Sequence, residues 1–250
     1  MIILNAGVPR SGTVLVNAIL RELLRENRVP VTQANPHGPQ LARVLTTLRM
    51  NGQYLHKTVL VHTHSWDDQA AREIAEMPGT IVFGNFRDPR DVCVSLMRLH
   101  DHDYETAMRL VAGSFNALDN MCTAVPVMTI PYELLVAEKR AHIFQIARRI
   151  GLWPRLDQVG RVDAATSVDR HKQVMEQVNA GEIDGLTRRS NTNRVLVEDP
   201  KTLINDRHIQ SGVSGRWRAE LTEAQQADAT ERLAPLLARF GYPDAPGEAP

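Results

Sequence analysis

A glycine-rich turn near the start of the sequence has residues that suit phosphate binding. It stands between an apolar run and an amphipathic stretch, and its residues are Gly7-Val8-Pro9-Arg10-Ser11-Gly12-Thr13. Where such a turn joins a strand to a helix, backbone N–H groups and the positive end of the helix dipole meet at one point. The Arg10 guanidinium adds a full charge in a planar fork that matches phosphate or sulfate oxygens, and Ser11 and Thr13 add hydroxyl donors. The sequence therefore predicts an anion site formed by Arg10, Ser11, Gly12, Thr13 and Val14.

The spacing from Gly7 to Gly12 equals that of the nucleotide P-loop, but the residues that follow differ. The nucleotide loop continues with Lys and then Ser or Thr, whereas Thr13 and Val14 follow here. The lysine that reaches the β- and γ-phosphates is missing, and so is the hydroxyl that binds Mg²⁺. The pattern argues against an ATP or GTP hydrolase and favours a phosphate site without a metal. A tight turn with a surface arginine is the structural alternative.

A second pair of residues, Arg87 and Ser95, lies where a predicted strand runs into a predicted helix. The segment is Arg87-Asp88-Pro89-Arg90-Asp91-Val92-Cys93-Val94-Ser95. Arg87 falls at the carboxyl end of the strand, where open α/β sheets bind ligands, and Pro89 fits the first turn of the helix. Arg87 and Ser95 converge on one anion if both face the same cleft, whereas an ordinary salt bridge is the alternative for Arg87. Arg90 and Asp91 are expected in surface or interhelix contacts.

Two histidines, His62 and His64, stand at the end of the second predicted strand and share one face of it, since residues two apart in a strand point the same way. Imidazole titrates near neutral pH, so a histidine here can remove a proton from a hydroxyl group. Two alternatives stay open. One is that His64 is a hydrogen-bonded core histidine. The other is a metal site that joins this pair to His100 and His102, because transition metals favour imidazole ligands.

The elements that position these residues alternate between short apolar runs and longer amphipathic stretches. Strands are expected over Ile2–Ala6, Val59–His62, Thr80–Phe86 and Val125–Ile130. Helices are expected over Thr13–Glu26, Asp67–Glu76, Pro89–Leu99, Tyr104–Met121, Glu133–Ile150 and Asp157–Ala180, with a last helix that Thr222 and Gln225 cap and Gly241 ends. The alternation predicts an α/β fold with a parallel central sheet flanked by helices. We expect a single domain over residues 1–242, a lid or acceptor loop over 181–215 and a flexible tail over 243–250.

Composition excludes several classes of protein. The chain has 250 residues, 29 Lys and Arg against 29 Asp and Glu, and 5% aromatic residues. With no net charge there is no global basic field for nucleic acid or an anionic membrane, and few rings can stack on single strands. No run of 18 apolar residues is present and no signal peptide fits the start, so a cytoplasmic protein without a membrane span is expected. Cys93 and Cys122 are too few for a disulfide framework and are expected to be buried, apolar thiols.

The two phosphate motifs together resemble those of the sulfotransferase family that uses 3′-phosphoadenosine 5′-phosphosulfate (PAPS). Its members have a loop similar to Pro-Lys/Arg-Ser-Gly-Thr for the 5′-phosphosulfate, and Pro9-Arg10-Ser11-Gly12-Thr13 matches it. They also have a motif similar to Arg-x-Pro-x-Asp-Val-x-Val-Ser for the 3′-phosphate, which the segment from Arg87 to Ser95 matches. The resemblance covers residues 2 to about 222. It implies a P-loop-like sulfotransferase fold, with the 5′ end of the nucleotide at Arg10 and its 3′-phosphate at Arg87 and Ser95.

Three shorter segments extend the resemblance. His64 ends His62-Thr63-His64, where members have Lys-Thr-His, and it corresponds to their general base. Tyr132, in Pro131-Tyr132-Glu133, corresponds to a tyrosine that contacts the adenine. Ser211 and Gly212 lie in Gln210-Ser211-Gly212-Val213-Ser214-Gly215-Arg216-Trp217, which is similar to the Arg-Lys-Gly-x-x-Gly-Asp-Trp segment that closes on the 3′-phosphate. Gln210 and Ser211 replace both basic residues of that segment, and Trp217 is expected to be a packing anchor.

The resemblance implies an enzyme that moves the sulfuryl group of PAPS to a hydroxyl, or an amine, by in-line displacement. The co-product is adenosine 3′,5′-bisphosphate (PAP), no metal is expected, and nucleic acid is not expected as a partner. The acceptor is a small molecule, a glycan or a peptide, and the sequence fixes neither it nor the oligomeric state. The alternatives are a P-loop kinase of a small metabolite and a nucleotide-binding protein without catalysis.

Overall fold

The computed structural model describes residues 1–36, 39–51, 57–64, 68–182, 186–189, 195–198 and 213–242. The chain folds into two compact units. The first consists of Met1–Thr13, Thr32–Glu133 and Val213–Pro250, and the second of Val14–Val31 and Leu134–Gly212. The expectation of one domain over residues 1–242 stays a prediction.

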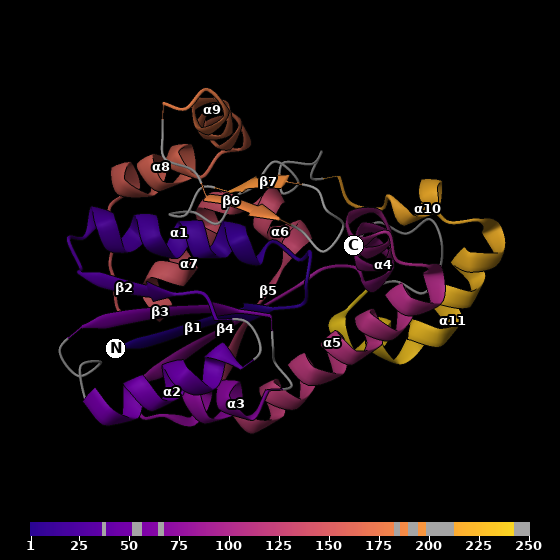
Figure 1. Cartoon of the computed structure of the whole chain (residues 1–250), viewed down its shortest axis with the longest axis horizontal. Helices are drawn as coiled ribbons and strands as arrows, with labels where there is room; N and C mark the ends of the chain where they lie inside the picture. The colour runs from indigo at the N-terminus through magenta and orange to yellow at the C-terminus, as the bar shows by residue number, and fades with distance from the viewer. Residues whose placement is uncertain are drawn as a thin grey trace. The chain divides into compact units, whose positions relative to one another are not determined.

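A five-stranded sheet forms the centre of the first unit (Figure 1). Its strands are β1 (Ile2–Gly7), β2 (Val31–Ala34), β3 (Thr58–Thr63), β4 (Thr80–Phe86) and β5 (Val127–Pro131). Their spatial order is β2-β3-β1-β4-β5, and β1 pairs in parallel with both β3 and β4, as β4 does with β5. The expected α/β fold with a parallel central sheet is therefore confirmed.

The strand order reverses beside β1, and this determines where a ligand can bind. The chain fills the β2–β3 side of β1 first and then crosses to β4 on the other side. In the register of the sheet, Ala6 lies opposite Thr63 of β3, and Gly7 lies opposite Asn85 of β4. The carboxyl ends of these three strands therefore lie level with one another, at the switch point where open α/β sheets bind ligands.

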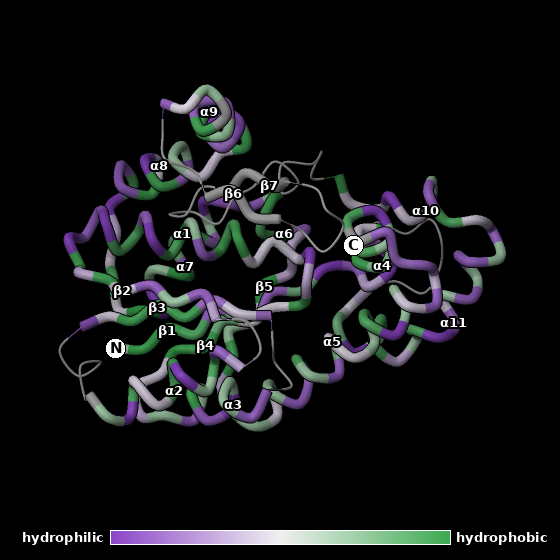
Figure 2. The backbone as a smooth tube through the Cα atoms, viewed as in Figure 1, coloured by the Kyte–Doolittle hydropathy of each residue, from purple (hydrophilic) through white to green (hydrophobic). Residues whose placement is uncertain are grey.

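The described helices of the first unit share an apolar core with its sheet. They are α2 (Gln40–Asn51), α3 (Gln69–Glu76), α4 (Pro89–His100), α5 (Tyr104–Ala124), α10 (Trp217–Glu220) and α11 (Glu223–Phe240). Ile2, Leu4 and Ala6 of β1 are fully buried in this core, and α10 and α11 contact α4. The colouring by hydropathy shows β1 and β4 as apolar strands, with α2 and α3 side by side along the sheet (Figures 1 and 2). Because the strands are apolar and buried, their ends are rigid supports for polar side chains.

The second unit is mainly helical. Its elements are α1 (Thr13–Glu26), α6 (Tyr132–Ala137), α7 (Lys139–Arg149), α8 (Leu156–Ala165), α9 (Val168–Asn179), β6 (Leu186–Arg189) and β7 (Val195–Glu198), and α1 and α6 begin in the first unit. The single helix expected over Glu133–Ile150 is two helices that break at Glu138. The one expected over Asp157–Ala180 is also two, because the Ser167 side chain accepts from Arg170 N and caps a new helix.

Other differences concern short or polar elements. Strand β2 and helix α2 were not predicted from the sequence, and no strands were predicted between residues 181 and 215, where β6 and β7 pair antiparallel. The tail over 243–250 lies outside the described residues. The last helix is confirmed: Thr222 and Gln225 form its capping box, and Gly241 ends it with a φ of 77°. Among the described residues, no helix is both long and apolar enough to cross a membrane.

Candidate active site

The phosphate loop folds back on the end of strand β4. Val8 N donates to Asn85 O at 2.9 Å, and Ser11 N donates to Val8 O at 3.3 Å, which closes a tight turn. A Cβ on Gly7 would lie 2.8 Å from Thr13 Oγ1 and 2.9 Å from Asn85 Cβ, so only glycine permits this approach. Arg10 has a φ of 67°, in the left-handed region. Alternation of right- and left-handed residues makes a backbone concavity that suits an anion.

Ser11 is a loop-shaping residue in this structure. It is fully buried, and its hydroxyl contacts Val8 O and, at 2.9 Å, Asn85 O. Both its hydroxyl and its N–H are therefore engaged within the first unit, whereas the sequence analysis expected them to face the anion. The hydroxyl oxygen of Thr13 is buried, and it has no hydrogen-bond partner in the described part of the chain. The contacts of Ser11, Thr13 and Val14 with an anion stay predictions.

Gly12 is the point where Tyr132 packs against the loop. Its φ is 81°, and a Cβ there would lie 2.6 Å from Cδ2 of the Tyr132 ring. Tyr132 directly follows strand β5, so the ring spans from β5 to the loop after β1. The ring also contacts the next charged residue of the site, because the Arg87 guanidinium carbon lies 4.8 Å from its centroid.

We expect Gly12→Ala to lower the free energy of unfolding by about 3 kcal/mol. About 1–2 kcal/mol comes from the left-handed backbone and the rest from the clash with Tyr132. Gly79→Ala is the matched control, because Gly79 has a φ of 79° and a Cβ there would meet no described atom within 4 Å. Thermal unfolding of both variants measures the difference. Equal losses of stability would show that Tyr132 does not pack on the loop.

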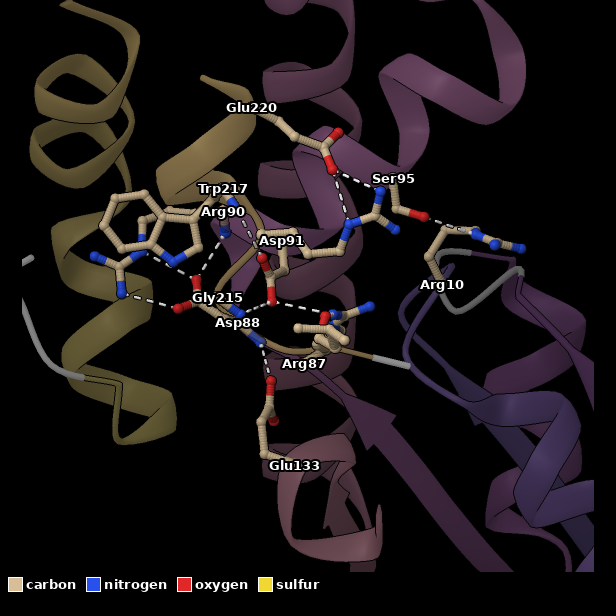
Figure 3. Close-up of polar contacts among 12 residues, drawn as sticks. Arg10, Arg87, Asp88, Arg90, Asp91, Ser95, Glu133, Gly215, Trp217 and Glu220 are labelled. Carbon is tan, nitrogen blue, oxygen red and sulfur yellow. Dashed lines mark hydrogen bonds and ion pairs between the residues drawn. The ribbon is translucent and has the colours of Figure 1, made fainter. Parts of the chain in front are cut away.

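Arg10 points from the loop towards helix α4, where its Nε donates to Ser95 Oγ at 2.9 Å (Figure 3). Burial lowers the pKa of Arg10 to about 10, and the positive charge of Arg87 contributes to the decrease, while Tyr132 opposes it. The two motifs therefore bring two like charges into one electrostatic neighbourhood. Such an arrangement favours an anion, because a negative group between two cations relieves their repulsion.

Arg87 follows strand β4 and is almost fully buried, with 9% of its surface exposed. Its Nη2 donates to Asp91 Oδ2 at 3.1 Å and to Val213 O at 2.6 Å. Its Nε is buried and lacks a hydrogen-bond partner among the described residues. A buried donor of this kind is costly unless a ligand or water satisfies it, so it marks a binding position.

Asp91 joins Arg87 to the segment that precedes helix α10. Its Oδ2 accepts from Gly215 N at 2.7 Å, and its Oδ1 accepts from Trp217 N at 3.0 Å (Figure 3). Burial raises the pKa of Asp91, while the Arg87 charge and the two backbone N–H groups oppose the rise. Of the two expected settings for Asp91, the surface contact is wrong, since Asp91 is 2% exposed, whereas its bond with Trp217 of α10 is an interhelix contact. Its partners Gly215 and Trp217 lie 124 and 126 positions further along the chain.

Arg90 is also buried and not at the surface. Its guanidinium forms two hydrogen bonds with Asp88, at 3.0 and 2.9 Å, and lies 4.0 Å from the centre of the Trp217 ring. Its contact with Thr230 of helix α11 at 3.4 Å is an interhelix contact, as expected. Trp217 is fully buried, which confirms it as a packing anchor. The anchor keeps the segment before α10 beside Arg87.

We expect Asp91→Asn to lower the free energy of unfolding by about 3 kcal/mol. The amide keeps one acceptor oxygen but turns an NH₂ group toward donors, so either Trp217 N or the pair Arg87 Nη2 and Gly215 N loses its acceptor. Asp119→Asn is the control, because Asp119 pairs with Arg239 at 2.7 Å on the surface, where a pair contributes at most about 1 kcal/mol. Thermal unfolding of both variants provides the measurement. Equal losses of stability in the two variants would contradict the role of Asp91.

His64 lies at the end of strand β3, next to the phosphate loop. Its Nδ1 is 3.1 Å from Gly7 O. A carbonyl oxygen only accepts, so Nδ1 carries the proton and Nε2 is the basic nitrogen of the ring. His62 is 3% exposed and its Nδ1 lies 3.3 Å from Asn5 Nδ2, so it is a hydrogen-bonded core histidine.

The metal alternative gains no support from the described residues. Within them, no three side chains of His, Cys, Asp or Glu lie close enough together to bind a metal ion. His62 and His64 contact each other edge to face, with 5.3 Å between ring centres. The side chain of His100 lies outside the described residues. Cys93 is buried and Cys122 half-buried, both as free thiols.

The structure therefore brings together Arg10, Arg87 and Tyr132, which follow strands β1, β4 and β5, with His64 directly after β3. Ser95 of helix α4 contacts Arg10, whereas it was expected beside Arg87. Ser211 and Gly212 lie outside the described residues, and Val14 belongs to the second unit.

Three polar residues of this neighbourhood were missed by sequence reasoning. They are Asn5, Asn85 and, in its buried role, Asp91. Asn5 and Asn85 stand inside otherwise apolar strands, Ile-Ile-Leu-Asn-Ala-Gly and Thr-Ile-Val-Phe-Gly-Asn-Phe, and both are fully buried. An amide in such a run is a usable signal, because a buried polar group needs hydrogen-bond partners.

Comparison with solved structures finds sulfotransferases. A mouse sulfotransferase complexed with PAP has a TM-score of 0.62 at 15% identity, over 94% of this chain and 84% of that chain. Retinol dehydratase in complex with androsterone and inactive cofactor PAP has a TM-score of 0.62 at 16% identity, over 94% and 80% of the two chains. The sulfotransferase domain from the curacin biosynthetic pathway has a TM-score of 0.56 at 13% identity, over 97% and 98%. No protein-family model and no curated protein matches the sequence. The expected sulfotransferase fold is confirmed.

Proposed function

We propose that this protein is a PAPS-dependent sulfotransferase that acts on a hydroxyl group of an acceptor, or less readily on an amine. The observation that carries the proposal is the pair Arg10 and Arg87. The two arginines follow adjacent strands, both neighbour Tyr132, and the charge of Arg87 lowers the pKa of Arg10. A molecule with a phosphate at each end of an adenosine fits such a pair. Solved structures of the same fold contain PAP, which supports this choice of nucleotide.

The residues of the chain fit the nucleotide on chemical grounds. The loop around Gly12 and the fork of Arg10 suit the 5′-phosphate, where negative charge grows on the leaving oxygen. Arg87 suits the 3′-phosphate, because its buried Nε still needs an acceptor. Tyr132 lies close to both cations and is the expected neighbour of the adenine. PAPS when bound supplies the sulfuryl group, and its phosphate leaving group needs no metal.

His64 is the proposed general base. Its protonated Nδ1 is directed to Gly7 O at 3.1 Å, which places the lone pair on Nε2, the atom proposed to take the acceptor proton. The oxygen of the acceptor then attacks sulfur in line with the departing 5′-phosphate oxygen. Arg10 stabilises the charge that appears there, and Ser95 Oγ orients the Arg10 side chain from helix α4. Donors organised in this way typically contribute about 3–4 kcal/mol each to catalysis.

Calorimetry with PAP in the presence of EDTA is the decisive experiment. We expect micromolar or tighter binding of PAP, and binding of adenosine 5′-phosphate at least about tenfold weaker because Arg87 loses its partner. Absence of PAP binding, or turnover of ATP that depends on Mg²⁺, would refute the proposal in favour of a kinase. A library of alcohols, phenols, sugars and peptides with labelled PAPS then identifies the acceptor. Tight PAP binding without transfer to any acceptor would indicate a nucleotide-binding protein without catalysis.

A further inference from the structure

Two backbone carbonyls fix the orientation of a chain of buried amides below the phosphate loop. Asn85 Nδ2 lies 3.3 Å from Ala6 O, which can only accept, so the nitrogen of this amide must face β1. The same nitrogen donates to Asn5 Oδ1 at 2.9 Å, which identifies the oxygen of the second amide. Asn5 Nδ2 in turn donates to Thr13 O at 3.0 Å, again a pure acceptor. The contacts with Ala6 O at one end and with Thr13 O at the other therefore require the same assignment of oxygen and nitrogen in the two amide groups.

This assignment determines the protonation of His62. Asn5 Nδ2 has two hydrogens; one is directed to Thr13 O, and the other points at His62 Nδ1, 3.3 Å away. An amide nitrogen cannot accept, so His62 Nδ1 must be the acceptor and carry no proton. The neutral ring of His62 then has its proton on Nε2. His64, whose Nδ1 faces Gly7 O at 3.1 Å, has the opposite tautomer.

We propose that Asn5 and Asn85 are positioning residues that hold His62 in the tautomer opposite to that of His64, which Gly7 O sets, so that His64 and not His62 serves as the base. The inference rests on the proposed function for its catalytic consequence. The lone pair of His62 is directed into the amide chain, whereas that of His64 is on Nε2. Because the Asn5 amide also binds Thr13 O, the same chain ties the end of the phosphate loop to the strand that carries the base.

Nitrogen-15 NMR of the imidazole rings tests the inference without any measurement of activity. The spectra are recorded at pH 8.5, about two units above the usual imidazole pKa. We expect His62 to show an unprotonated Nδ1 and a protonated Nε2, and His64 the reverse. His62→Gln and His64→Gln each remove one set of signals and so assign them. A protonated Nδ1 on His62 in the wild-type protein would overturn the inference.

Asn5→Asp provides the perturbation. The new carboxylate accepts where the amide donated, so the signal of His62 Nδ1 should move to the position of a protonated nitrogen. Asn116→Asp is the matched control, because Asn116 is exposed on helix α5 and the same chemical change there should leave both rings unaltered. A His62 Nδ1 that stays unprotonated in the Asn5→Asp protein would contradict the inference. If that variant does not fold, the wild-type spectrum decides alone.

Formation of PAP from PAPS, with water or a supplied alcohol as acceptor, separates the two histidines by function. The carbonyl oxygen of the glutamine in His62→Gln can accept from Asn5, so turnover should fall less than about tenfold. The turnover of His64→Gln should be at least about a hundredfold below that of the wild-type protein, because a hundredfold is the lower limit for loss of a general base. Equal losses in the two variants would overturn the assignment. Calorimetry with PAP depends neither on the NMR spectra nor on turnover. If the protein has the expected tautomers but does not bind PAP, the proposed function is refuted and the inference about the tautomers still holds.

Discussion

His64→Ala should lower turnover by about 10²–10⁴-fold, because removal of a general base typically has this effect. The affinity for PAP should stay within about twofold of the wild-type value, since no contact of His64 with Arg10 or Arg87 is needed to bind the phosphates. Its contact at Gly7 O is a single hydrogen bond at the end of β3, and the loop retains the bonds from Val8 N and Ser11 N. Single-turnover formation of PAP and calorimetry measure the two quantities separately.

His102→Ala is the matched control, because His102 lies beyond the end of helix α4 and takes no part in the proposed chemistry. It should leave both turnover and PAP affinity unchanged. If His64→Ala keeps more than a tenth of wild-type turnover, the base lies elsewhere. If it abolishes PAP binding instead, His64 supports the loop and does not act on the acceptor.

Arg87→Ala should raise the dissociation constant of PAP about a hundredfold, while turnover at saturating PAPS falls less than about tenfold. Loss of one partner of a buried charged pair costs about 2–5 kcal/mol, and each 1.4 kcal/mol is a factor of about ten. The variant should also lose the preference for PAP over adenosine 5′-phosphate, because the 3′-phosphate is the group that Arg87 is proposed to bind. Calorimetry with both nucleotides measures this directly.

The fold should tolerate this change better than the site does. Asp91 still accepts from Gly215 N and Trp217 N after Arg87 is removed, and the pKa of Arg10 should rise because a neighbouring positive charge is gone. Arg98→Ala is the control, since Arg98 of helix α4 forms an exposed pair with Glu220. A variant without Arg87 that still prefers PAP would move the 3′-phosphate site to another residue.

The sequence was sufficient to predict the features that depend on one residue type and its immediate neighbours in the chain. Gly7 and Gly12 permit backbone geometry that other residues resist, and an apolar run such as that of β1 buries itself on both faces. The positions of Arg10 and Arg87 could be predicted because Arg87 directly follows such a strand and Arg10 lies in the loop that follows another. The sequence could not establish that Arg10 and Arg87 lie close together. Their proximity depends on β1 and β4 being neighbours in the sheet, and the spatial order of strands does not follow from their order in the sequence.

What escaped the sequence depends on long-range contacts. Strand β2 is short and partly exposed, so its residues Val-Thr-Gln-Ala have little periodicity that distinguishes them from a loop. Asp91 has the appearance of an ordinary first-turn acid on α4, and its role follows only from partners more than a hundred residues away. The hydrogen bond between the side chains of Asn5 and Asn85 likewise forms only because their strands are neighbours in the sheet.

The bonds from Asp91 to Gly215 and Trp217 have a consequence for the order in which the protein acquires its activity during translation. A nascent chain that ends just after β5 already contains Arg10 and Arg87. The carboxylate of Asp91 still lacks the N–H of Gly215, which is synthesised 124 residues later. Competence to bind nucleotide should therefore appear late in synthesis, as an abrupt step on a series of stalled ribosome complexes.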